Sequence, residues 1–206
     1  VNTIRSYNKR HREEYGELVI ACDNRHYWRR EVFPFYKASR KASRESSGLD
    51  WSSIFETLNM VRDELTEVFP YPVIDVDGAE ADDVIGTLAA YSQTQGTPGP
   101  LFEEEIIPEP FIGDKGDGIP NMLSPDDTFV TNVRQRPIRK KLLAEWKTMD
   151  PQDFVTGETA HGYNRNSLLV DLTKTPDDIK EDIINTYKSQ TNKEKHSLLD
   201  YFIKNK

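Results

Sequence analysis

Apolar and polar positions follow two different periods along this chain. Residues 17–22 and 72–76 are short apolar runs with the aliphatic and β-branched side chains typical of buried strands. Residues 3–15, 50–68 and 80–95 predict helices, the second of them by apolar positions that recur every three or four residues. Because helices and strands alternate, we expect an α/β fold with a mostly parallel central sheet flanked by helices.

The predicted helix over 50–68 has one strongly apolar face. The face includes Trp51, Phe55, Leu58 and Val61. Its Trp51 and Phe55 side chains could pack in a core or form a stacking platform for bases, and the helical spacing favours the core.

Two parts of the chain lack this periodicity. We expect residues 26–47 to be irregular, and residues 97–110 to be a loop or a join between segments.

The C-terminal third of the chain predicts a helical region. Its helices are predicted over 140–148, over a segment capped by Thr175 with Pro176 at its first position, and over 193–204. We therefore expect an α/β core over 1–112 and a helical region over 113–206.

Composition excludes several classes of protein. No apolar run approaches the roughly 18 residues of a membrane helix, so we expect no membrane partner. The single cysteine, Cys22, excludes an internal disulfide and suits a cytoplasmic protein. The four histidines are scattered, which disfavours a zinc site. The chain begins without methionine inside a predicted helix, so we expect further sequence before it.

The net charge of −8 conceals two basic blocks, one with seven basic residues against Glu31 and one with six against Glu145. The first consists of Arg25, Arg29, Arg30, Lys37, Arg40, Lys41 and Arg44, and the second of Arg134, Arg136, Arg139, Lys140, Lys141 and Lys147. Basic blocks on an acidic background fit a protein that grips phosphates. The alternative is that each block is a solvated helix face.

Acidic residues gather where the second predicted strand passes into a helix. Glu80, Asp82 and Asp83 fall within four residues, and Asp23 ends the first predicted strand. Oxygen-only clusters suit Mg²⁺ or Mn²⁺. The alternative is structural, because acids in the first turn of a helix interact favourably with its dipole.

A second acidic group, Asp114 and Asp117, lies in Gly113-Asp114-Lys115-Gly116-Asp117-Gly118-Ile119-Pro120-Asn121. In isolation this segment is typical of an ordinary Gly/Asp turn.

Taken together and in order, these motifs resemble the 5′-nuclease (flap endonuclease) superfamily, with its PIN-like fold, and within it a phage subgroup of ribonuclease H-type enzymes. The motifs are Cys22-Asp23-Asn24, Tyr27-Trp28-Arg29-Arg30, Phe35-Tyr36-Lys37, Glu80-Ala81-Asp82-Asp83 and the Gly113–Asn121 segment. The resemblance implies a metal-dependent 5′→3′ exonuclease and 5′-flap endonuclease that removes RNA primers and adjacent DNA during replication.

The resemblance also implies roles for individual residues. Two Mg²⁺ ions, with Mn²⁺ able to substitute, would be held by Asp23, Glu80, Asp82, Asp83, Asp114 and Asp117. Lys37 and Arg29 would act at the scissile phosphate. Nucleic acid would be bound by Arg30, Arg40, Lys41, Arg44, Arg139, Lys140 and Lys141.

The implied substrates are 5′-flap or forked DNA and RNA·DNA hybrids, bound by a monomer in the cytoplasm, or in the host cytoplasm for a viral protein. A single-strand-binding protein or a sliding clamp is expected as a partner by resemblance only.

The chain also departs from the superfamily pattern. An early strand with an aspartate and a mid-chain strand with an acidic pair are missing, the latter where residues 97–110 stand. We favour a join across absent residues. The alternatives are a catalytically defective protein that binds branched DNA and, more distantly, a magnesium phosphohydrolase acting on a small phosphate ester.

Overall fold

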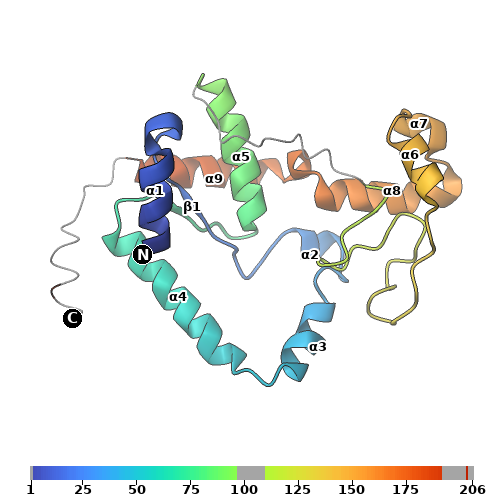
Figure 1. Cartoon of the computed structure of the whole chain (residues 1–206), viewed down its shortest axis with the longest axis horizontal. Helices are drawn as coiled ribbons and strands as arrows, with labels where there is room; N and C mark the ends of the chain where they lie inside the picture. The colour runs from blue at the N-terminus through green and yellow to red at the C-terminus, as the bar shows by residue number, and fades with distance from the viewer. Residues whose placement is uncertain (1, 97–109, 192–202, 204–206) are drawn as a thin grey trace. The chain divides into compact units, whose positions relative to one another are not determined.

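The computed structural model describes residues 2–96, 110–191 and 203 (Figure 1). The loop predicted over 97–110 and the helix predicted over 193–204 therefore lie almost wholly outside the described residues. None of the described helices is long and apolar enough to cross a membrane.

The chain forms two compact units. The first holds the described residues of Val1–Tyr27, Asp50–Glu103 and Thr175–Lys206, and the second those of Trp28–Leu49 and Glu104–Lys174. The predicted division at residue 112 stays a prediction.

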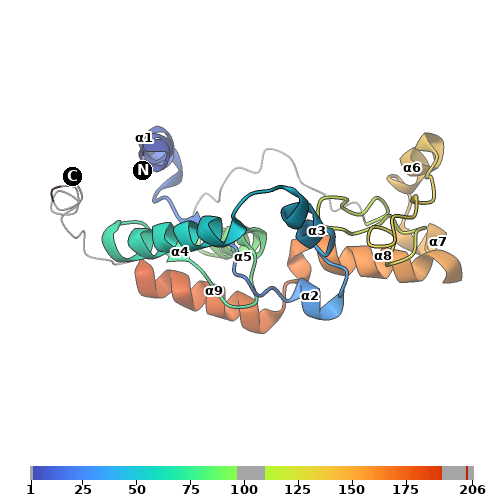
Figure 2. The same cartoon turned by 90° about the horizontal axis from the view of Figure 1, so that it is seen from below.

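The first unit is built on two parallel strands, β1 (Ile20–Ala21) and β2 (Val73–Ile74), with Ile20 opposite Val73. Helix α5 (Ala81–Thr94) crosses and packs against α9 (Asp177–Gln190) (Figure 1). Both α9 and α4 (Trp51–Val68) contact β2, and the two helices lie in different layers (Figure 2). The predicted α/β fold with a parallel sheet is thus confirmed. The remaining helix, α1 (Asn2–Tyr15), buries none of its described side chains.

The regular strands are shorter than predicted, but the two chain segments stay paired beyond them. Cys22 N donates to the carbonyl oxygen of Ile74 at 2.9 Å, and Asn24 N donates to that of Ala79 at 3.1 Å. This pairing carries the residues after β1 alongside the start of α5.

The predicted buried face of α4 is wrong. The helix has no buried residue, and Phe55, Leu58 and Val61 are 43%, 57% and 44% exposed. An 18-residue helix is about 27 Å long, whereas two strand residues extend about 7 Å, so β2 is too short to cover this face.

The regular elements described in the second unit are helices joined by irregular segments. The elements of the second unit are α2 (Arg29–Val32), α3 (Ser39–Ser46), α6 (Lys140–Trp146), α7 (Pro151–Phe154), α8 (Gly157–Val170) and the 3₁₀ turn η1 (Leu172–Lys174). Helices α2 and α3 lie within residues 26–47, so the prediction that this segment is irregular is wrong. Helix α3 buries no residue, so it has no apolar periodicity by which the sequence could reveal it.

An aromatic cluster forms the core of the second unit. Phe111, Met122, Trp146 and Phe154 are buried together, and the rings of Trp146 and Phe154 stack at 5.4 Å between centroids. This core joins α6 and α7 to the segment that follows Phe111, and so supports the Gly113–Asn121 segment.

Candidate active site

The strand-end aspartate is tied directly to the acidic helix start. Asp23 is exposed after β1, and its Oδ1 accepts a hydrogen bond from Ala81 N at 2.8 Å. This bond satisfies one of the free N–H groups in the first turn of α5. It places the Asp23 carboxylate beside the acids of that turn.

Two of those acids form a capping box. The Glu80 side chain accepts from Asp83 N, and Asp83 Oδ2 accepts from Glu80 N at 2.9 Å. Asp83 Oδ1 also accepts from the Thr175 hydroxyl at 2.6 Å. Glu80 and Asp83 are 4% and 0% exposed, whereas Asp82 is exposed. In this structure Glu80 and Asp83 hold the helix start together, and Asp82 faces solvent.

Two further aspartates follow β2 at the same end of the sheet, and the sequence analysis did not select them. Asp75 accepts from Asn24 Nδ2 at 2.8 Å and pairs with Arg62 Nη1 at 2.9 Å, while Asp77 lies 3.2 Å from His26 Nδ1. Asp77 directly follows the strand predicted over 72–76, and this position was the signal that could have revealed it.

The neighbouring Cys22 thiol is held in its neutral form. Burial, followed by the charge of Asp75, raises its pKa above the usual value. A neutral, half-buried thiol is a poor nucleophile, so Cys22 is not a candidate for covalent catalysis.

In the second unit, Asp114 organises a tight turn. Its Oδ1 accepts from Gly116 N at 2.7 Å and from Asp117 N at 3.1 Å, and its backbone pairs with Ile119. Gly113 has φ +70°, and a Cβ there would lie 2.4 Å from the Ile119 carbonyl oxygen, so only glycine fits. The exposed Asp114 carboxylate is thus part of the turn that presents it.

Asp117 receives several donors from the basic segment that contains α3. Its Oδ2 accepts from the Tyr36 hydroxyl at 2.8 Å, and its Oδ1 lies 2.7 Å from Arg40 Nη2 and 3.5 Å from Lys37 Nζ. Lys37 N also donates to the Asp117 carbonyl oxygen at 2.8 Å. Lys37 itself has φ +55°, an uncommon conformation for a non-glycine residue. These bonds position the Lys37 ammonium against the acidic loop.

The two predicted catalytic cations differ in exposure. The Lys37 side chain is 13% exposed, whereas Arg29 is 2% exposed and donates from Nε to the Leu169 carbonyl oxygen at 2.7 Å. The Arg29 guanidinium also lies 4.7 Å from the centroid of the Trp28 ring. Burial against α8 disfavours direct contact between Arg29 and a phosphate.

Helix α8 supplies two positioning residues that the sequence analysis did not select. Arg165 donates to the carbonyl oxygens of Pro120 and Asn121 at 2.7 and 3.1 Å, and Asn166 Nδ2 donates to that of Pro120 at 2.9 Å. Both side chains are buried. They fix the end of the Gly113–Asn121 segment, and sequence spacing alone could not reveal contacts that span 44 to 46 residues.

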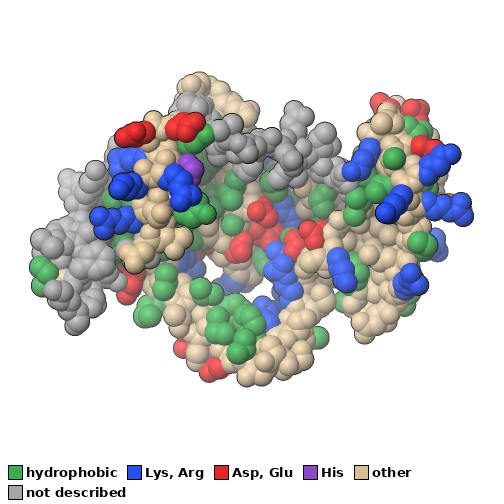
Figure 3. Space-filling model, in the orientation of Figure 1, with side chains coloured by type: hydrophobic (Ala, Val, Ile, Leu, Met, Phe, Trp, Pro, Cys, Tyr) green, Lys and Arg blue, Asp and Glu red, His purple; other side chains and the backbone are tan. Residues whose placement is uncertain are grey.

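Most of the predicted nucleic-acid-binding residues reach solvent. Arg30, Arg40, Lys41, Arg139, Lys140 and Lys141 are exposed, and Arg44 is half-buried. Figure 3 shows Lys and Arg side chains spread over the region of α6 to α8, and also over α1. Helix α1 carries Arg5, Lys9, Arg10 and Arg12, a basic surface that the sequence analysis missed.

The expected acids belong to both units: Asp23, Glu80, Asp82 and Asp83 to the first, Asp114 and Asp117 to the second. Among the described residues, no group of three His, Cys, Asp or Glu side chains could hold a metal ion. The oxygen donors suit a hard divalent cation. However, only Asp23, Asp82 and Asp114 are exposed enough to offer a carboxylate without rearrangement.

Comparisons with known proteins agree with this arrangement of motifs. Residues 1–99 match the sequence profile of the 5′-3′ exonuclease N-terminal resolvase-like domain, and residues 102–206 match that of the T4 RNase H C-terminal domain. The "Ribonuclease H" of Enterobacteria phage T4 is 28% identical over 230 residues, covering 92% of this chain and 75% of the phage protein. The "5′-3′ exonuclease" of Streptomyces coelicolor is 36% identical over 85 residues, which cover 40% of this chain and 28% of the bacterial protein.

The alignment with the phage protein is longer than the part of this chain that it covers. It spans 230 positions, whereas 92% of this 206-residue chain is about 190 residues, so about 40 positions of the alignment have no residue of this chain. The two matching profiles together span nearly the whole chain, the second of them more than half of it. The chain therefore belongs to the 5′-3′ exonuclease family in its T4 ribonuclease H branch, a family of nucleases that hydrolyse phosphodiester bonds.

Proposed function

We propose that this chain acts as a divalent-metal-dependent 5′→3′ exonuclease and 5′-flap endonuclease on flaps, forks and RNA·DNA hybrids, removing RNA primers and adjacent DNA during replication. The observation that carries the proposal is the bond between Asp23 and Ala81 N. It unites a strand-end carboxylate with the exposed Asp82 at one end of the parallel sheet. In α/β proteins this is where functional groups gather.

The metal chemistry rests on family membership and on the donors present. Mg²⁺ is the expected ion, with two per active site and Mn²⁺ able to substitute. When bound, such ions supply an activated water and neutralise charge on the phosphate. Asp23 and Asp82 would bind metal directly in the first unit, and Asp114 in the second. Glu80 and Asp83 are buried and Asp117 is 23% exposed, so these three carboxylates would have to become more accessible before they bind a metal ion.

The chain's own cations would then act on the nucleic acid. Lys37, held by Asp117, stabilises charge that develops on the phosphate. Arg40, Lys41 and Arg44 on α3, with Arg30, grip the strand near the cut. Arg139, Lys140 and Lys141 at the start of α6 grip the duplex. We expect a cytoplasmic monomer, with a single-strand-binding protein or sliding clamp as partner.

The experiment compares two aspartates in equivalent helix positions. Asp82 and Asp178 are each the second residue of a helix, α5 and α9, and both are exposed. Asp82→Asn should lower cleavage of a labelled 5′-flap by roughly 10²-fold or more, while Asp178→Asn should leave it unchanged. Calorimetric titration with Mn²⁺ should show weaker binding only for Asp82→Asn. Equal cleavage and equal Mn²⁺ affinity in both variants would remove Asp82 from the mechanism.

A second candidate function is binding of branched DNA without cleavage. It is favoured by the lack, within the described residues, of three acids grouped to hold a metal ion. The wild-type chain incubated with flap substrate and Mg²⁺ or Mn²⁺, against an EDTA control, separates the two. Metal-dependent product supports the nuclease, and tight binding without product supports the second candidate.

A further inference from the structure

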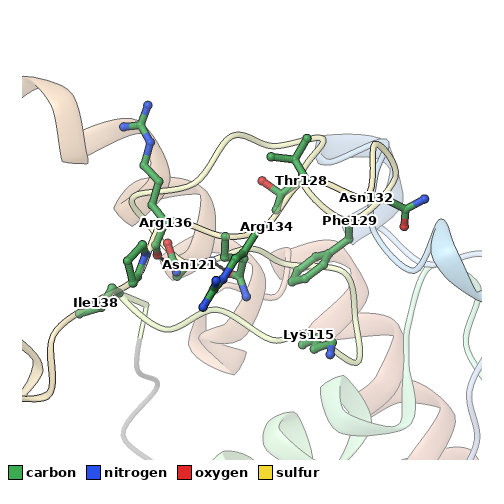
Figure 4. Close-up of a pocket in the computed structure, with 11 residues that line it drawn as sticks. Lys115, Asn121, Thr128, Phe129, Asn132, Arg134, Arg136 and Ile138 are labelled. Atoms are coloured by element: carbon green, nitrogen blue, oxygen red, sulfur yellow. Dashed lines mark hydrogen bonds between the residues drawn. The ribbon is translucent and has the colours of Figure 1, made fainter.

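The second unit contains a hollow that the proposed catalytic residues do not use. Its volume is about 530 Å³, within the range of small-ligand sites. Its lining includes Lys115, Asn121, Phe129, Asn132, Arg134 and Ile138 (Figure 4). The lining therefore combines an aromatic ring, aliphatic side chains, amides and cations.

Hydrogen bonds hold the walls of this hollow in place. Asn121 N donates to Gln135 Oε1 at 2.7 Å, and Asn121 Nδ2 donates to the Arg136 carbonyl oxygen at 2.8 Å. Val133 N donates to the Thr128 carbonyl oxygen at 3.2 Å and closes the turn that carries Phe129. The two sides of the hollow are thus bonded to each other, and the site is preformed.

The charge of the hollow is entirely positive. Lys115, Arg134 and Arg136 line it, no acidic residue does, and none of these three cations forms an ion pair with a described residue. Nearby Asp126 is already paired with Arg165. Figure 4 shows Arg134, Phe129 and Lys115 on one side of the hollow, with the Arg136 guanidinium directed away. An anionic ligand with a flat apolar part would complement this surface.

We propose that this hollow binds an unpaired nucleotide of the substrate strand, with its base against Phe129 and a phosphate held by Arg134 and Lys115. The assignment rests on the proposed nuclease function. An unpaired base has a free face that stacks on an aromatic ring, and cations hold the backbone beside it. A duplex presents its phosphates on the outside and keeps its bases stacked, so it would gain little from a concave site with an aromatic wall. Asn132 and Gln135 also line the hollow, and amide groups can donate to and accept from polar base edges.

The test measures binding of short fluorescent oligothymidylate and oligouridylate strands by anisotropy, with a blunt hairpin duplex as the comparison ligand. Phe129→Leu keeps an apolar side chain but removes the stacking face. It should weaken strand binding about tenfold, a factor that corresponds to about 1.4 kcal/mol, and leave duplex binding within twofold. Arg134→Gln should lower the slope of log affinity against log salt by about 0.7 for single strands. Lys174→Gln removes an exposed charge in the same unit that does not line the hollow; this variant is the control and should leave strand binding unchanged.

Each outcome supports or overturns the assignment. Unchanged strand affinity in Phe129→Leu, or an equal loss for strand and duplex, overturns the nucleotide site. If Phe129→Leu does not fold, the variant at the exposed Arg134 is used instead. An unchanged slope of log affinity against log salt in Arg134→Gln would then overturn the site. A wild-type protein that binds strands through Phe129 but cleaves no flap refutes the proposed function alone. A protein that cleaves flaps but binds strands independently of Phe129 and Arg134 refutes this site alone.

Discussion

Thr175→Val provides a sharp test of how the acidic end of α5 is held. The Thr175 hydroxyl donates to Asp83 Oδ1 at 2.6 Å, and the two residues are 2% and 0% exposed. Valine has nearly the same shape but cannot donate, so the substitution removes the bond and opens little space. Hydrogen bonds to charged groups contribute about 1.5–3 kcal/mol, and solvent cannot replace this donor at a buried site.

We therefore expect Thr175→Val to lower the free energy of unfolding by about 2 kcal/mol. For a chain of this length that corresponds to a fall in Tm of about 4–8 °C. Urea unfolding followed by circular dichroism and by tryptophan fluorescence gives the free energy where the two transitions coincide.

Thr173→Val is the matched control. The Thr173 hydroxyl donates to Asp171 Oδ1 at the same 2.6 Å, but Thr173 is exposed, so water can take over the bond. This change should cost less than about 0.5 kcal/mol. Equal losses in the two variants would refute the argument from burial. A double-mutant cycle of Thr175→Val with Asp83→Ala should show a coupling of at least about 0.5 kcal/mol, and additive losses would contradict a direct bond.

Three further predictions concern the second unit. Gly162→Ala should destabilise the protein by about 3 kcal/mol in urea unfolding, because its Cβ would lie 2.1 Å from the Met122 carbonyl oxygen. Gly157→Ala in the same helix meets open space and should be neutral. Partial burial raises the pKa of Asp126, but hydrogen bonds from its two basic partners outweigh burial and leave the pKa below the usual range. The Asp126 carboxylate therefore adds stability to the folded protein above the pKa of the unfolded state, and this stability is lost as the pH falls through the pKa of the folded state. Asp126→Asn should lower the free energy of unfolding at pH 7 and should no longer lower it in strong acid. Lys37→Ala should slow single-turnover flap cleavage by roughly 10²-fold with little change in half-saturating enzyme concentration, and a wild-type rate at saturation would make Lys37 a binding residue.

Local pattern was sufficient for much of the fold. Helices α1, α4 and α5 lie close to their predicted bounds, because apolar spacing and stop residues such as Gly16 and Gly96 act within a few neighbours. The predicted cap of α9 is wrong: the helix begins at Asp177 after Pro176, and the Thr175 hydroxyl donates to Asp83 instead. The sequence also placed Asp23 just after the first strand, where the structure has it.

Burial and pairing did not follow from local pattern. Arg29, which the resemblance assigns to the scissile phosphate, is buried against Leu169, 140 residues away. Asp83, which the resemblance assigns to the metal, accepts from Thr175, 92 residues away. The apolar face of α4 is likewise exposed because β2, with two residues, is too short to cover it.

The order of residues thus determined which segments became helices and strands and which acids and bases stood at their junctions, because those features depend on neighbouring residues. Tertiary structure alone decided which of these charges remained open to a ligand. Desolvation and hydrogen bonding depend on partners brought from distant parts of the chain, and in this protein those partners occupy Glu80, Asp83 and Asp117 while leaving Asp23 and Asp82 exposed.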